Sequence, residues 1–230
     1  MFLHYFDPHD PYDPPEPFRS KFPSQKNEPN YLEKLLSKIQ DDKSLYLGKI
    51  ICRYDGEFAF TDHEIGKVFE ALKHLGLEED TLVVLTSDHG EGLGQHNLVG
   101  HSINIYEEAV RVPLLFLWPN HIPKGLELSS LVEGVDIMPT ILDLIGVNQE
   151  GLSLHGQSMA SALRGGSESN KDRAVHLFRE YYTGRYNQGL YEKTFHKGNK
   201  LAIRKGKWKY LEGKEENSKE LFDLLSDPKN

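Results

Sequence analysis

The sequence predicts an α/β fold in which a mostly parallel sheet is flanked by helices, followed by a small α+β subdomain that contains an antiparallel sheet. A helical periodicity from about residue 45 to 75 ends at Gly76 and leads directly into the apolar stretch 81–87. A second apolar stretch covers 112–118, and past Gly151 the segments become shorter and more alternating. A helix that feeds a strand covered on both faces is typical of a parallel sheet.

The first residues, 1–6, are apolar and aromatic and predict a buried strand, with His4 in or against the core. A core strand without any lead-in leads us to expect an internal piece of a longer protein. Residues 7–17 hold five prolines, which exclude helix and central strand and predict a stiff loop. We expect a short amphipathic helix from about 30 to 40.

The periodicity at 45–75 predicts one long helix with a bend near Gly56. After the strand at 81–87 we expect a glycine-rich loop from Asp88 to Gly100 and a helix at 103–110. The strand at 112–118 is followed by a helix over 136–145, with Asp136 as its N-cap.

We place a domain boundary near residue 165, so that 1–165 form a partial α/β domain and 166–230 a truncated α+β subdomain. Short strands are predicted at 174–178, 200–204 and 208–211. The last two are expected to form an antiparallel hairpin across Lys205-Gly206.

The composition excludes several classes of protein. A formal net charge of −8 argues against a sequence-independent nucleic-acid binder, which needs a basic surface. The longest apolar run is far shorter than the roughly 20 residues of a membrane-spanning helix. The single cysteine, Cys52, cannot form an internal disulfide or a cysteine metal cluster, and we expect it to be a small buried residue.

The candidate chemistry lies where the strand at 81–87 ends, since open α/β sheets bind ligands at the carboxyl ends of their strands. Asp88 and His89 follow that strand, and His96 and His101 lie in the same glycine-rich loop. A carboxylate and an imidazole suit Ca, Mg, Mn or Zn. The alternative is a helix-capping aspartate with solvated histidines in a flexible loop.

Two further groups deserve an interpretation. Ser87, Asp88 and His89 are adjacent, and adjacent side chains diverge, so they cannot form a catalytic relay. His9 lies in the proline-rich loop, where it is either presented to a ligand at the edge of the sheet or is a histidine of a surface turn.

Five motifs together resemble the sulfatases of the alkaline-phosphatase superfamily, and they occur in family order over nearly the whole chain. They are His4-Tyr-Phe-Asp-Pro-His-Asp-Pro-Tyr, Leu85-Thr-Ser-Asp-His-Gly-Glu-Gly-Leu-Gly-Gln-His, Tyr106-Glu-Glu-Ala-Val-Arg-Val-Pro-Leu, Val135-Asp-Ile-Met-Pro-Thr-Ile-Leu-Asp-Leu, and Ala202-Ile-Arg-Lys-Gly-Lys-Trp-Lys-Tyr with Leu221-Phe-Asp-Leu. The resemblance implies an alkaline-phosphatase-like fold and hydrolysis of a sulfate ester.

The resemblance also implies the roles of individual residues. Asp88 and His89 correspond to ligands of one divalent metal ion, with Ca expected first and Mn, Mg or Zn as alternatives. His9 corresponds to a histidine that contacts the sulfate ester and takes part in catalysis. His101 stands where many sulfatases have a lysine with the same contact. The expected partner is a small aryl or sugar sulfate, and the resemblance is compatible with a periplasmic or extracellular location as well as a cytoplasmic one.

Sulfatases carry a Cys-X-Pro-X-Arg or Ser-X-Pro-X-Arg signature whose first residue becomes formylglycine, the nucleophile, and neither form occurs in the 230 residues. The chain therefore resembles the portion after the nucleophile, and we expect it to be inactive alone. Two alternatives stay open. One is a phosphodiester or phosphonate monoester hydrolase of the same superfamily, and the other is a non-catalytic truncated product.

Overall fold

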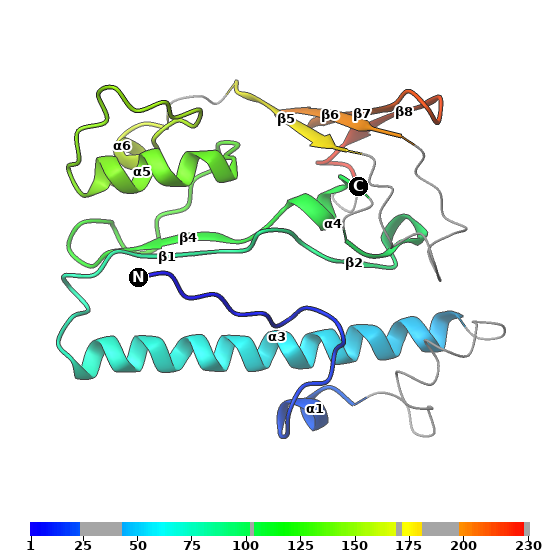
Figure 1. Cartoon of the computed structure of the whole chain (residues 1–230), viewed down its shortest axis with the longest axis horizontal. Coiled ribbons are helices and arrows are strands. Elements are labelled where there is room, and N and C mark those ends of the chain that lie inside the picture. The colour runs from blue at the N-terminus through cyan, green and yellow to red at the C-terminus, as the bar shows by residue number, and fades with distance from the viewer. Residues whose placement is uncertain (24–42, 102–103, 169–171, 181–197, 228–230) are drawn as a thin grey trace. The chain divides into compact units, whose positions relative to one another are not determined.

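The computed structural model describes residues 1–23, 43–101, 104–168, 172–180 and 198–227. The chain divides into two compact units, residues 1–78 with 97–99, and residues 79–96 with 100–230 (Figure 1). The helix expected at 30–40 lies outside the described residues, and the boundary placed near residue 165 stays a prediction. None of the described helices is long and apolar enough to span a membrane.

The first unit is built on one long helix, α3 (Lys43–His74), with the short helix α1 (Phe18–Lys21) against it. The long helix is confirmed, but it runs uninterrupted through Gly56 instead of bending there (Figure 1). Gly56 serves close packing, because a Cβ atom at this position would lie 2.6 Å from Cγ of Pro14. Cys52 is only partly buried on this helix.

The buried strand predicted for the N-terminal residues is wrong. Residues 1–6 form no strand and are exposed, with Phe2 at 88% and Phe6 at 66% of full exposure, and His4 is exposed as well. An apolar segment becomes a core strand only when neighbouring strands accept its backbone hydrogen bonds and cover its side chains. No described strand pairs with these residues.

In the second unit, β1 (Val83–Thr86) and β4 (Leu114–Leu117) are the strands expected at 81–87 and 112–118. They pair with each other in antiparallel register, Leu85 opposite Leu115. The parallel direction that we expected for these strands is therefore wrong for this pair. Their apolar composition predicts burial in either direction, but Leu115 and Leu117 are exposed among the described residues, at 56% and 46% of full exposure.

The segment between these strands carries β2 (Gly92–Leu93), the 3-10 helix η1 (Gln95–Asn97), β3 (Val99–Gly100) and helix α4 (Glu107–Val110). The helix expected at 103–110 is thus a single turn.

Helix α5 (Ile137–Leu144) confirms the helix expected at 136–145, and it follows the 3-10 helix η2 (Gly134–Asp136). With α6 (Ala160–Leu163) it forms an apolar core around Leu144, Ala160 and Leu163. Asp136 is the N-cap of α5 by position, but its side chain makes no capping bond to that helix. Its fully buried carboxylate instead accepts hydrogen bonds from the N–H groups of Glu133 and Gln157 and from the Arg173 guanidinium.

The C-terminal part is one antiparallel sheet in the order β5 (Ala174–Arg179), β6 (Lys200–Lys205), β7 (Trp208–Gly213) and β8 (Ser218–Asp223) (Figure 1). The predicted hairpin is confirmed, with Lys205 opposite Trp208 and Gly206 at a φ of 55° in the turn. A positive φ of this kind is what glycine supplies in a tight hairpin.

A buried ion cluster joins α4 to this sheet. The Glu107 carboxylate accepts hydrogen bonds from Arg204 on β6 at 2.7 Å and from Lys209 on β7 at 2.8 Å. Lys209 is fully buried and the Glu107 side chain is 8% exposed. Burial lowers the pKa of Lys209, and the Glu107 carboxylate opposes that effect. Tyr106 adds a second link, since its hydroxyl donates to the Glu220 carboxylate on β8.

Glu107→Gln should lower the free energy of unfolding by about 3–5 kcal/mol, because it leaves the Lys209 ammonium buried without a counter-charge. Urea unfolding followed by circular dichroism measures the change. The matched control is Glu212→Gln in the same sheet, where the partner Lys219 is 67% exposed, and its effect should stay within about 1 kcal/mol. Equal effects of the two substitutions would contradict a special role for the buried cluster.

Asp136 should make the stability depend on acid pH. Burial raises its pKa, but the hydrogen bonds from Arg173, Gln157 and Glu133 lower it further, so the folded value lies below the ordinary 3.8. The ionised carboxylate therefore stabilises the fold above about pH 4, and this contribution disappears as the pH falls through the folded pKa. Asp136→Asn should lower stability at pH 7 and flatten its decline below about pH 4, measured by urea unfolding at several pH values. Exposed Asp80→Asn is the control, and a decline as steep as in the wild type would contradict the assignment.

Candidate active site

Asp88 and His89 lie directly after β1, as the sequence predicts. Oδ1 of Asp88 accepts the His89 backbone N–H at 3.0 Å, and Oδ2 lies 3.8 Å from Nε2 of His89. The Asp88 side chain is 80% exposed, so its carboxylate is accessible to a ligand. The Ser87 hydroxyl donates to the backbone oxygen of His89 at 2.7 Å, not to its ring, which agrees with the absence of a Ser-Asp-His relay.

The His89 ring has a defined orientation. Its Nδ1 lies 2.9 Å from the Gly90 carbonyl oxygen, which only accepts hydrogen bonds, so Nδ1 carries the hydrogen. In the neutral ring Nε2 then keeps its lone pair and faces the Asp88 side. This arrangement, with one ring nitrogen donating to a backbone carbonyl, is typical of metal-binding histidines. Slight burial raises the pKa of Asp88, but His89 and the nearby N–H groups lower it further, so the net shift of this pKa is downward.

Gly90 holds this turn against α4. Its N–H donates to the Ala109 carbonyl at 2.9 Å. A Cβ atom at Gly90 would lie 2.1 Å from the Glu108 backbone oxygen, so no other residue fits without a shift of the backbone. The position of Asp88 and His89 is therefore tied to α4.

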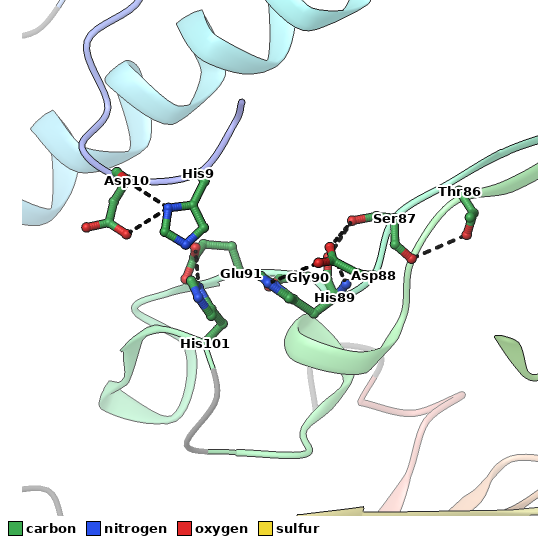
Figure 2. Close-up of polar contacts among 9 residues, drawn as sticks. All are labelled: His9, Asp10, Thr86, Ser87, Asp88, His89, Gly90, Glu91 and His101. Carbon is green, nitrogen blue, oxygen red and sulfur yellow. Dashed lines mark hydrogen bonds and ion pairs between the residues drawn. The ribbon is translucent and has the colours of Figure 1, made fainter. Parts of the chain in front are cut away.

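The loop brings His101 to His89 although twelve positions separate them. The two rings stack with centroids 4.1 Å apart at 24°. Nδ1 of His101 lies 3.0 Å from Oε2 of Glu91, whose side chain is 6% exposed (Figure 2). Asp88, His89 and His101 thus gather in one place.

His9 belongs to the other unit. Its Nδ1 lies 2.7 Å from the Asp10 carbonyl oxygen, and its ring packs against Phe6 with centroids 4.7 Å apart. Its predicted contact with the sulfate ester stays a prediction.

The third histidine of the loop, His96, contacts helix α4 and its N-cap residue. Its ring stacks on Tyr106 with centroids 3.8 Å apart at 6°, and its Nδ1 lies 3.0 Å from Oε1 of Glu108. Its φ of 53° is in the left-handed region. Both partners belong to α4 or its N-cap, so His96 fastens the loop to this helix.

Within the described ranges, no group of three or more His, Cys, Asp and Glu side chains is arranged to hold a metal ion. The predicted role of Asp88 and His89 as metal ligands therefore stays a prediction. Sequence reasoning assigned no role to Glu91, since residue spacing in a glycine-rich loop sets no distance between side chains. An acidic residue beside a cluster of histidines is the signal that could have identified it.

Two family models match the chain: Sulfatase over residues 1–147, and N-sulphoglucosamine sulphohydrolase, C-terminal, over residues 94–230. Arylsulfatase K of Bos taurus is 34% identical over 179 residues, which is 74% of this chain and 30% of that protein. An arylsulfatase of Clostridium perfringens is 29% identical over 98% of this chain and 44% of its own length. The chain thus spans less than half of these relatives.

Solved structures show the same fold. The phosphonate monoester hydrolase of Agrobacterium radiobacter superposes with a TM-score of 0.77 and 25% identity, covering 98% of this chain and 50% of that one. A structure in complex with its substrate D-glucosamine-2-N,6-O-disulfate gives a TM-score of 0.71 at 22% identity, covering 86% of this chain and 39% of that one. The alkaline-phosphatase-like fold class is therefore confirmed. With both family models covering more than half of its residues, the chain belongs to the sulfatase family.

Proposed function

We propose that residues 1–230 form part of a sulfuric-ester hydrolase in which Asp88 and His89 bind one divalent metal ion. His101 and His9 contact the sulfate ester. The observation that carries the proposal is the gathering of an accessible carboxylate, an oriented imidazole and a second imidazole directly after β1. Sulfatase relatives over most of the chain support the same reaction.

The two proposed ligands fit a divalent cation by their chemistry. Asp88 supplies a hard oxygen, which suits Ca, Mg and Mn, and His89 supplies a nitrogen, which suits Zn. A cation bound there supplies positive charge that stabilises the negative charge of the ester oxygens. The described residues form no group of three or more candidate ligands, so further residues are needed to complete the proposed metal site.

The histidines serve the leaving group. Hydrolysis breaks the bond between sulfur and the ester oxygen, the incoming oxygen becomes bonded to sulfur, and the departing alcohol takes up a proton. An imidazole within hydrogen-bond reach of the ester oxygen donates that proton or balances its charge. We assign this role to His101, with His9 as a second contact to the sulfate group.

The substrate class follows from the relatives. They are named arylsulfatase and choline-sulfatase, and one similar structure holds a disulfated glucosamine. A small sulfated alcohol, aryl or sugar, is the substrate that we propose. The formylglycine signature of the family does not occur in these 230 residues, so they do not supply the nucleophile of the covalent step.

A phosphonate monoester hydrolase is the second candidate, because the Agrobacterium radiobacter enzyme superposes over 98% of the chain. The test is an assay of the protein expressed from its natural gene, with 4-nitrophenyl sulfate and 4-nitrophenyl phenylphosphonate. Both release the same alcohol, so differences in the leaving group do not affect the ratio of their kcat/KM values. A higher value for the sulfate supports our proposal, and a higher value for the phosphonate supports the second candidate.

Asp88→Ala in that protein should abolish metal retention, measured by elemental analysis after dialysis. The fold should persist, because the side chain is 80% exposed and such substitutions change stability by about 0.5 kcal/mol or less. Activity should fall by more than the roughly 10–100-fold that loss of an outer-shell partner costs. Asp80→Ala, an exposed aspartate of the same unit, should retain both, and unchanged metal content in Asp88→Ala would refute the assignment.

His101→Ala should lower kcat for 4-nitrophenyl sulfate by about 10²–10⁴-fold, the usual contribution of a general acid. His101→Lys should retain more activity, since an ammonium also donates a proton and carries the positive charge. The dependence of kcat on the pKa of the leaving phenol should steepen in His101→Ala. If the alanine variant were as active as the wild type, His101 would only order the loop.

A further inference from the structure

We propose that Glu91 is a positioning residue for His101, fixing which ring nitrogen His101 presents to the ester. The inference deepens the proposed function and rests on it for the contact between His101 and the substrate. The orientation of the ring itself follows from the structure of the loop alone.

The hydrogen bond between the two side chains defines the ring atom by atom. Oε2 of Glu91 lies 3.0 Å from Nδ1 of His101, and an ionised carboxylate only accepts hydrogen bonds. Nδ1 therefore carries a hydrogen and is engaged. Nε2 is the nitrogen that we propose to contact the ester, as an acceptor in the neutral ring and as a donor in the charged ring.

A second contact fixes the plane of the ring. His101 stacks on His89 with centroids 4.1 Å apart. Stacking alone permits the ring to rotate by a half-turn about its Cβ–Cγ bond. This rotation would move both nitrogens to the opposite edge of the ring and break the hydrogen bond to Glu91. The Glu91 side chain is 6% exposed, so the surrounding residues restrict the positions that its carboxylate can take. Together the two contacts select one orientation.

The same loop contains a second histidine that contacts a carboxylate, His96 with Glu108 of α4. Nδ1 of His96 also lies 3.0 Å from a carboxylate oxygen, Oε1 of Glu108, and the Glu108 side chain is 8% exposed. There the ring stacks on Tyr106 instead of a proposed metal ligand. This pair separates the effect of a histidine–carboxylate bond as such from its effect on His101.

The test is nuclear magnetic resonance of residues 1–230 labelled with ¹⁵N-histidine, recorded at alkaline pH, where each ring is neutral and its Nδ1–H form can be distinguished from its Nε2–H form. We expect Nδ1–H at His101 in the wild type and in Glu91→Gln, whose amide oxygen accepts the same bond. Glu91→Leu should lose this preference, because the acceptor that selects the form is gone. Glu108→Leu should change His96 and leave His101 as in the wild type. Nε2–H at His101 in the wild type, or Nδ1–H retained in Glu91→Leu, would overturn the proposal.

Activity supplies the second readout, in the protein expressed from its natural gene. Glu91→Leu should lower kcat for 4-nitrophenyl sulfate by about 10–100-fold, as expected for loss of a residue that orients a functional side chain. Glu91→Gln should restore most of that loss, which a purely structural defect would not predict. If Glu91→Leu loses the ring preference but keeps full kcat, the positioning role is refuted. If the wild type hydrolyses only the phosphonate, the proposed function fails while the ring measurement still decides the role of Glu91.

Discussion

The buried carboxylate of Glu107 is the constraint on which the second unit depends. Arg204 and Lys209 face each other on neighbouring strands, and both donate to this one side chain on α4. A fully buried ammonium is costly unless a counter-charge meets it, so the sheet and α4 must stay together. Because Gly90 packs on the same helix without room for a Cβ atom, the constraint extends to the turn that carries the proposed metal ligands. The C-terminal sheet therefore stabilises the turn that carries Asp88 and His89, although neither proposed metal ligand belongs to the sheet.

Local patterns of the sequence predicted those parts of the fold that depend on local interactions. The periodicity at 45–75 yielded α3, and the turn at Lys205-Gly206 yielded the hairpin of β6 and β7. The direction of β4 relative to β1 could not be obtained this way, because a buried strand has the same composition in both directions. The exposed residues 1–6 show the converse limit, since an apolar run is a core strand only where other strands cover it.

In the candidate site, too, the contacts between neighbours in the sequence could be predicted and the longer-range contacts could not. Asp88 and His89 could be identified because they follow a recognisable strand, and their contact is between neighbours in the sequence. The pairing of His101 with Glu91 depends on the path of the nine residues between them, three of which are glycines, and no periodicity encodes such a path. Glu107 pairs with residues that are distant in the sequence. Its partners lie 97 and 102 residues away, which spacing within the helix does not reveal.

The presence of a histidine at position 101, where the sulfatase resemblance implies a lysine in many members, explains why this loop needs Glu91. An ammonium group carries three equivalent donors on a flexible stem, so it reaches an anion from many side-chain conformations. An imidazole has two inequivalent nitrogens in a rigid ring, and only one of them faces a given ligand. Such a ring must be held in one orientation before it can replace the ammonium. The hydrogen bond from Nδ1 to Glu91 and the stacking on His89 meet that requirement, which a lysine at the same position would not impose.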